Sequence, residues 1–258
     1  MQPDFGAELK RWRAQRRMSQ LDLGLSANVS ARHISFLETG RARPSRSMVL
    51  NLCAELDVPR SGRNHMLSAA GLAPAYGART LSDADMAPVR EAVDWLLARH
   101  APYPAFAVDR YWVVQALNPA ADLLMGTAGL KVGDSLMDAL TDNDRLRSAI
   151  DNLDEVIRYG LQRLRTESAH LGGDTVLETA IDRLTRQVAH LPSSDAGLLP
   201  AFIPTRYRFG DMVLSFFSTI TQFGTAEDVA LSELKIEMMF PADIETRKAI
   251  NAMSGSQV

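Results

Sequence analysis

Residues 20–39 carry the most restrictive pattern in the chain, because their small, capping and apolar residues suit two short helices that cross at close range. Gly24 is small enough for the crossing point, and Asn28 tolerates the positive φ that the turn between the helices requires. Val29 follows as an apolar anchor for the turn, and Ser30 suits the N-cap of the second helix. The segment therefore predicts a helix-turn-helix.

The second helix of this pair has an apolar inner face and a polar outer face. Ile34 and Leu37 share the inner face at helical spacing. A helix of this kind can lie in the major groove of DNA with its N-terminal side chains at the base edges. We expect Arg32 to bond guanine bidentately, His33 to donate to guanine or phosphate, and Ala31 to touch a thymine methyl. The predicted DNA contacts are Gln20, Ser30, Ala31, Arg32, His33, Ser35, Arg41, Arg43 and Arg46.

Several of these residues are predicted to meet the phosphate backbone. Gln20 begins a helix, where side chain and main-chain N–H can hold a phosphate together. Arg41, Arg43 and Arg46 surround the start of the next helix and can neutralise phosphates. Residues 1–76 hold 11 Lys and Arg against 6 Asp and Glu, a net charge of +5, whereas the remainder carries −8. A basic N-terminal region before an acidic remainder indicates that only the N-terminal region binds a polyanion. The alternative is a helical bundle that binds a protein partner.

The same region resembles a known family of DNA-binding regulators. The segments that carry the likeness are Ser19-Gln20, Val29-Ser30, Ile34-Ser35 and Glu38-x-Gly40-x-x-x-Pro44-Ser45. They resemble the Xre/lambda-repressor-type family over residues 15–58. The resemblance implies a five-helix domain that binds a double-stranded DNA operator, usually as a homodimer. Leu21 and Leu25 depart from the family pattern, since polar residues are usual at these positions. The two side chains can form an exposed apolar patch or lie in the core, and the sequence allows both.

After a linker, the predicted secondary structure changes from helices alone to a mixture of strands and helices. We expect a DNA-binding domain over 1–72, a linker over 73–87 and a second domain over 88–258. Alternating apolar residues and turn signals predict strands at 105–108, 111–117, 207–209, 212–221 and about 233–240, with helices at 88–100 and 119–125 and two more interrupted at Gly172-Gly173. The predicted fold class is α+β: an all-α five-helix DNA-binding domain, then an antiparallel sheet with helices.

The second domain also resembles a known subfamily of these regulators. The segments concerned are Val58–Pro74, Tyr111–Gly126 with Leu117–Ala121 inside it, Phe216–Ile220 through Phe223-Gly224-Thr225, and Phe240–Asp243. They resemble the MmyB-like regulators, whose C-terminal domain is similar to a PAS sensor fold. The resemblance implies a small apolar ligand, with fatty acids proposed.

The residues themselves allow a cavity between a sheet and its covering helices. The candidate walls are Phe106, Val108, Trp112, Val114, Leu124, Phe202, Tyr207, Phe209, Phe216 and Phe217. Each of them also suits an ordinary core position. Arg206 and Arg208 flank Tyr207, where they can meet a carboxylate head or remain solvated. The predicted ligand contacts are these walls except Phe209, together with Arg206.

Other classes of function find little support. The five histidines are isolated, with no HxH or HExxH pattern, so no metal site, catalytic residue or cofactor is predicted. Cys53 lies in an apolar helical run and suits a buried thiol. A single cysteine and the absence of a long apolar run favour a cytoplasmic protein without a membrane partner. A second domain that only dimerises or binds protein, or that is an enzyme, remains the alternative to a sensor.

Overall fold

The computed structural model describes residues 4–77, 79–81, 83–190, 202–224 and 228–255. The chain divides into two compact units, and the main break along the sequence falls between residues 78 and 79; the first unit also includes residues 166–174 and 226–232, which hold the end of α10 and most of α12. The predicted linker at 73–87 spans this break, and its positions 78 and 82 lie outside the described residues. The bounds of that linker remain a prediction. The two units are described separately below.

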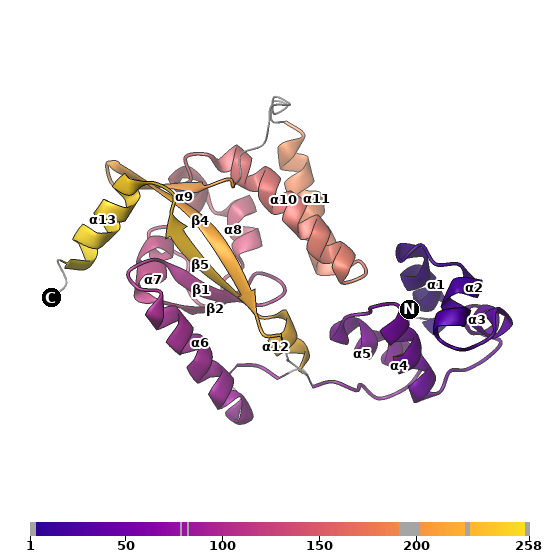
Figure 1. Cartoon of the computed structure of the whole chain (residues 1–258). Coiled ribbons are helices and arrows are strands. Elements are labelled where there is room, and N and C mark those ends of the chain that lie inside the picture. The colour runs from indigo at the N-terminus through magenta and orange to yellow at the C-terminus, as the bar shows by residue number, and fades with distance from the viewer. Residues whose placement is uncertain (1–3, 78, 82, 191–201, 225–227, 256–258) are drawn as a thin grey trace. The chain divides into compact units, whose positions relative to one another are not determined.

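The first unit is built from short helices, as the sequence predicts (Figure 1). They are α1 (Phe5–Gln15), α2 (Gln20–Ser26), α3 (Ala31–Glu38), α4 (Arg46–Glu55) and α5 (Arg60–Ala69). Side chains before four of them cap free N–H groups: Asp4, Ser19, Ser30 and Ser45. These caps explain why the helix starts could be recognised in the sequence.

One apolar core holds these helices together. Its fully buried large side chains are Leu9, Trp12, Leu23, Ile34, Leu37, Leu52, Leu56, Met66 and Leu67. Cys53 is buried in the same core, and burial raises the pKa of its thiol to about 12. The thiol therefore stays protonated and unreactive near neutral pH, in agreement with the predicted structural role.

The second unit contains an antiparallel sheet of five strands in the order β2-β1-β5-β4-β3. The strands are β1 (Ala105–Val108), β2 (Val114–Leu117), β3 (Thr205–Phe209), β4 (Met212–Gln222) and β5 (Lys235–Pro241). The chain's last strand, β5, lies between β1 and β4 and pairs with both. The predicted α+β class, with an all-α unit followed by an antiparallel sheet and helices, is confirmed.

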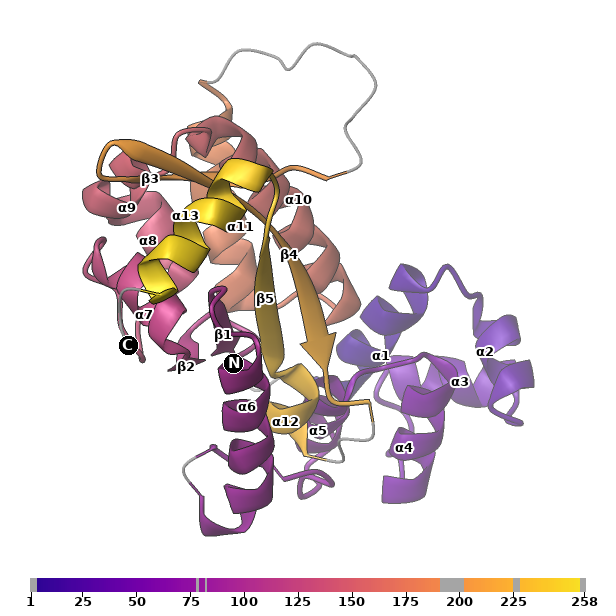
Figure 2. The ribbon, with the colours of Figure 1, turned by 60° about the vertical axis from the view of Figure 1, so that its left-hand side comes forward.

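Helices occupy the segments between the strands. Along the chain they are the 3-10 turn η1 (Ala84–Met86), α6 (Ala87–Arg99), α7 (Pro119–Gly126), α8 (Leu136–Asp142), α9 (Asp144–Ala149), α10 (Leu153–His170), α11 (Thr175–Val188), α12 (Val229–Glu233) and α13 (Ile244–Gly255). The predicted interruption between two helices lies between α10 and α11, where Gly172 and Gly173 have φ of 82° and 85°. In Figure 2, α13 lies along β4 and β5, which it contacts, while α6 and α7 contact β1.

Asn118 anchors the passage from β2 into α7. Its side-chain oxygen accepts hydrogen bonds from the N–H groups of Ala105 and Ala121, and its amide donates to the carbonyls of Leu97 and Tyr103. The side chain is therefore buried with its polar atoms bonded. It joins α6, β1 and α7 at one point.

The turn between β1 and β2 is longer than the sequence indicates. The predicted strands at 105–108 and 111–117 leave only Asp109 and Arg110 for the turn, and this prediction is wrong because β2 begins at Val114. The Asp109 carboxylate accepts hydrogen bonds from the N–H groups of Tyr111 at 2.8 Å and Val113 at 3.0 Å. A side chain that bonds the following backbone competes with strand pairing, and the loop curls instead.

Candidate DNA interface and ligand cavity

Side-chain caps fix the starts of α2 and α3. Ser19 Oγ accepts from the N–H of Asp22 at 3.1 Å, and the Asp22 carboxylate accepts from the N–H of Ser19 at 2.8 Å, which forms a capping box. Ser30 Oγ accepts from the N–H of His33 at 3.1 Å. Ser30, one of the predicted DNA contacts, therefore already uses its hydroxyl oxygen to begin α3.

The turn between the two helices is as tight as the sequence predicts. Asn28 has φ of 56°, and the N–H of Val29 donates to the carbonyl of Gly24 at 2.8 Å. A Cβ added at Gly24 would lie 2.8 Å from the carbonyl oxygen of Val29. A side chain cannot occupy that position without moving backbone, so glycine is required where α2 meets the turn.

Helix α3 presents one buried and one accessible face. Ile34 and Leu37 are buried in the core, and Arg32 near the start of the helix is exposed. Three further predicted contacts are partly exposed: Ala31, His33 and Ser35. The geometry therefore leaves the N-terminal side chains of α3 accessible, which a helix that reads base edges requires.

An aromatic side chain that the sequence analysis did not select lies within this face. The guanidinium carbons of Arg32 and Arg41 lie 5.2 Å and 6.0 Å from the centroid of Phe36. The carbonyl of Phe36 also accepts from the N–H of Arg41 at 2.8 Å, which turns the chain back at the end of α3. The four-residue spacing of Arg32 and Phe36 is the signal that could have indicated this contact.

A buried acid ties α3 to α1 and α2. Arg13 donates from Nε to Glu38 Oε1 at 2.6 Å and from Nη2 to Oε2 at 3.0 Å, and Gln20 Nε2 donates to Oε2 at 2.7 Å. Burial disfavours the charged form of Glu38, but the bonds from Arg13 and Gln20 outweigh it and hold the pKa of this carboxyl below its ordinary value. The side chain of Gln20 thus positions α3, while its main chain remains the first helical position of α2.

The three arginines predicted to meet phosphates have different surroundings. Arg41 and Arg43 are exposed. Arg46 donates from Nη1 to the carbonyl of Ala73 at 2.6 Å and from Nη2 to that of Pro74 at 3.1 Å. Its guanidinium fastens the segment after α5, so Arg41 and Arg43 are better placed for a polyanion.

The two leucines that depart from the family pattern lie on the surface of α2. Leu21 is 59% exposed and Leu25 is 73% exposed. They form the exposed apolar patch, and the core alternative is wrong.

The second unit contains a cavity of about 180 Å³ between the sheet and helices α7 to α11. This is well above the roughly 10–15 Å³ that one water molecule needs. Six of the predicted wall residues line it: Phe106, Trp112, Leu124, Tyr207, Phe216 and Phe217. The helices add apolar walls that the sequence analysis did not select, among them Met137, Leu140, Leu146, Ile150, Leu164 and Leu184.

Alternation along β3 separates Tyr207 from its neighbours. Thr205 and Tyr207 line the cavity, so Arg206 points to the opposite face of the strand. Arg206 lies 3.6 Å from both Asp151 and Glu155. The predicted ligand contact at Arg206 is therefore not part of the cavity wall. Arg208 likewise pairs with Asp151 at 2.5 Å.

Four other predicted wall residues also lie away from the cavity lining. Phe209, at the end of β3, is partly buried against the core of the second unit. Val108 and Val114 are fully buried in the core of the second unit, where β1 pairs with β2. Phe202 is 48% exposed, and its ring centroid lies 5.0 Å from that of Phe217. Val108 and Val114 are apolar because they pack between strands, and Phe202 is apolar because it pairs with another aromatic ring at the surface.

A polar cluster lies on the cavity wall at β4, β5 and α10. Arg163 Nη1 is 3.9 Å from Glu237 Oε2, and Ser218 Oγ donates to Glu237 Oε1 at 2.6 Å. The Arg163 guanidinium carbon lies 4.1 Å from the ring centroid of Trp112. Burial, followed by the charge of Glu237, raises the pKa of Tyr207, which remains a neutral phenol. The sequence signal that could have indicated this polar cluster is the presence of charged residues within the apolar run of β5.

Trp112 has an unusual backbone for a wall residue. Its φ is 60°, a region that bulky side chains seldom occupy. The Asp109 loop holds it there, with the N–H of Trp112 donating to the carbonyl of Asp109 at 3.0 Å. Strain of this kind persists only where the surroundings enforce it, and it gathers at ligand sites.

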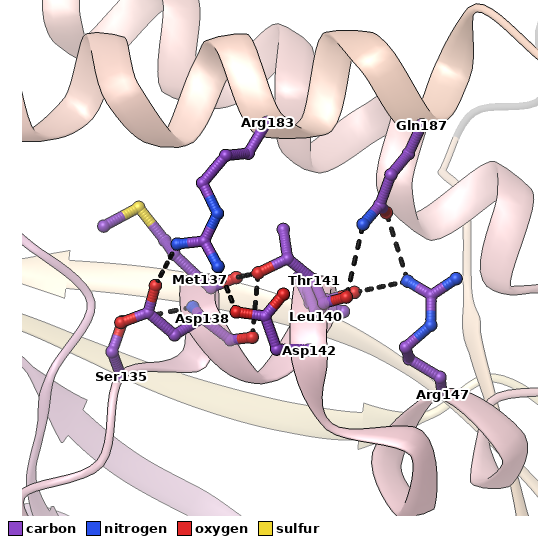
Figure 3. Close-up of polar contacts among 9 residues, drawn as sticks. All are labelled: Ser135, Met137, Asp138, Leu140, Thr141, Asp142, Arg147, Arg183 and Gln187. Atoms are coloured by element: carbon purple, nitrogen blue, oxygen red, sulfur yellow. Dashed lines mark hydrogen bonds and ion pairs between the residues drawn. The ribbon is translucent and has the colours of Figure 1, made fainter.

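Polar contacts join two helices that line the cavity, α8 and α11 (Figure 3). Arg183 of α11 reaches both Asp138 and Asp142 of α8, and Nη1 lies 2.6 Å from Asp138 Oδ1. Gln187 Nε2 donates to the carbonyl of Thr141 in α8 at 3.2 Å, and Gln187 Oε1 accepts from Arg147 Nη1 of α9 at 3.1 Å. These contacts lie between the two helices, which also supply apolar cavity walls through Met137, Leu140 and Leu184.

Two further features of the described residues bear on function. No helix among them is both long and apolar enough to cross a lipid bilayer. Nor does that part of the chain bring together three or more His, Cys, Asp or Glu side chains in a way that could hold a metal ion.

Comparisons with known proteins match a family model to each of two parts of the chain. Residues 4–66 match the family model described as a helix-turn-helix domain, and residues 89–253 match the one described as the MmyB-like transcription regulator ligand binding domain. The chain is therefore a DNA-binding transcription regulator with a ligand-binding domain. The second match covers more than half of its length, and the chain belongs to the family of MmyB-like transcription regulators. None of the curated proteins compared matches it.

Proposed function

We propose that this regulator binds a specific DNA operator as a homodimer and that a small apolar molecule in the second unit controls that binding. The observation that supports it most directly is the exposure of Arg32 on a helix whose opposite face is buried. A cytoplasmic location, where the regulator meets DNA, is part of the proposal.

DNA reading in this proposal divides between α3 and the loop after it. Arg32, at the N-terminal end of α3, meets base edges in the major groove, with His33, Ala31 and Ser35 beside it. Arg41 and Arg43 follow α3 and meet the phosphate backbone. The first group determines which sequence is bound, and the second contributes affinity for any duplex.

Footprinting on the DNA upstream of the regulator's own gene, followed by anisotropy titrations, tests this division. Arg32→Ala should weaken binding to the protected sequence by about 1–3 kcal/mol and leave binding to random DNA nearly unchanged. Arg43→Ala is the matched control, because it should weaken both and lower the salt dependence by about one counterion. Equal losses on both DNAs for Arg32→Ala would reject base reading, and a monomer on the footprinted site would reject the dimer.

The apolar lining and volume of the cavity support the ligand half of the proposal. A cavity with this lining favours an apolar molecule, such as one with an acyl chain. Native mass spectrometry of the full chain, before and after organic extraction, tests whether such a molecule is present. A protein that carries none and binds no medium-chain amphiphile in titrations would leave the second unit as a dimerisation or protein-interaction module.

A further inference from the structure

Charged side chains line the cavity wall at one place. Among the described residues that line it, Arg163 of α10 and Glu237 of β5 are the charged ones. Their nearest atoms, Nη1 and Oε2, lie 3.9 Å apart. The two side chains carry opposite charges, so the wall itself is close to neutral at this point.

The charged pair lies beside an opening of the cavity. Ser218 and Tyr159 line the cavity and are also exposed to solvent, whereas Leu146 and Phe216 line its buried part. Ser218 bonds directly to Glu237. A ligand with one polar end would therefore bury its apolar chain and leave its head beside Arg163 and Glu237.

We propose that the cavity takes an amphipathic molecule whose head is uncharged and both donates and accepts hydrogen bonds, such as a primary alcohol or a carboxamide, in preference to a carboxylate. This inference rests on the proposed ligand-binding function. A hydroxyl head accepts from the Arg163 guanidinium and donates to the Glu237 carboxylate, so both ends of the ion pair keep a partner.

A carboxylate head is disfavoured by Glu237. It would place a second negative charge beside an acid that is already partly removed from water, where like charges repel more strongly than in bulk solvent. Arg163 is also held in place, because its guanidinium lies over the ring of Trp112. Lys235 lies against the same ring, with Nζ 4.4 Å from the centroid, but the ring and not the ammonium forms the cavity wall.

The experiment compares two ligands of equal chain length, 1-decanol and decanoic acid, by calorimetry on the full chain after extraction of bound lipid. At pH 7.5 the alcohol should bind at least about tenfold more tightly than the acid. Glu237→Gln keeps an acceptor for Ser218 but removes the charge, and should reduce this preference to less than about twofold. Glu245→Gln, an exposed acid on α13, changes the net charge equally and should leave the preference intact.

The outcomes separate this inference from the function on which it rests. Tighter or equal binding of the acid by the natural protein overturns the inference while confirming a ligand cavity, and that result stands even if a variant fails to fold. An unchanged preference in folded Glu237→Gln also overturns it. Failure of both ligands to bind removes the ligand half of the proposed function together with this inference.

Discussion

The guanidinium carbon of Arg32 lies 5.2 Å from the ring centroid of Phe36, one helical turn further along α3. Arg41 approaches the same ring. Phe36→Leu should keep the apolar bulk but remove the attraction between the ring and the two guanidinium groups. A cation–π contact at an exposed site contributes about 0.5–1 kcal/mol. We expect operator binding to weaken by about two- to fivefold in an anisotropy titration, with Phe36→Tyr close to the natural protein. Identical affinities for Leu and Tyr variants would show that the ring does not orient the arginines.

Gly24 permits the contact between α2 and the turn that follows it. Gly24→Ala adds a Cβ 2.8 Å from the carbonyl oxygen of Val29, so backbone must shift. We expect a loss of about 1–3 kcal/mol in unfolding free energy, measured in urea, although alanine is the better helix former. Gly126→Ala is the control, because open space surrounds its Cβ, and it should be neutral or stabilising. A Gly24→Ala protein as stable as the Gly126→Ala protein would contradict the close crossing.

The pairing of Glu38 makes the stability of the first unit depend on pH. The pKa of this carboxyl is lowered from its ordinary value of 4.5, so its stabilising effect is complete above that value and is lost as the pH falls through the folded-state pKa. Glu38→Gln should cost about 1–3 kcal/mol at pH 7. The difference from the natural protein should shrink below about pH 4.5, as urea unfolding at several pH values would show. A difference that is constant with pH would mean that charge is not involved.

The contact between α8 and α11 separates polar from apolar contributions. Leu184 is 1% exposed, and Leu184→Ala should destabilise the protein by about 2–5 kcal/mol. Arg183 pairs with two exposed acids, so Arg183→Ala should cost less than about 1 kcal/mol despite its short contacts. Thermal unfolding of both variants checks the order. If Arg183→Ala proved the more damaging, the ion pairs and not the apolar side would hold α11.

Local chemistry made the first unit predictable from its sequence. Ser19 and Ser30 bond within three residues of their own positions, and the positive φ of Asn28 belongs to one residue. Such features leave signals that do not depend on the rest of the fold. The contact of Arg46 with Ala73 is the counterexample, since nothing near Arg46 in the sequence indicates a carbonyl partner after α5.

The cavity was only partly predictable, because its walls come from distant segments. The aromatic residues of the strands could be recognised, but Arg163 and Glu237 meet only through the folded sheet and α10. Strict alternation along β3 could have placed Arg206 away from Tyr207 before the structure was known. The loop at Trp112 depends on the Asp109 carboxylate, which accepts from the N–H groups of Tyr111 and Val113, and strand propensities do not capture such bonds.

The central position of β5 also has a consequence for biosynthesis. During translation β1 and β2 can form one hairpin, and β3 and β4 another, but β5 must emerge before the two are joined. Ala105 of β1 therefore stays unpaired on this side until Met238, its partner in β5, has been synthesised. Ribosome-bound chains that end before Lys235 should thus expose two unjoined hairpin edges and be substrates for chaperones, and the second unit should mature only after β5 has been made.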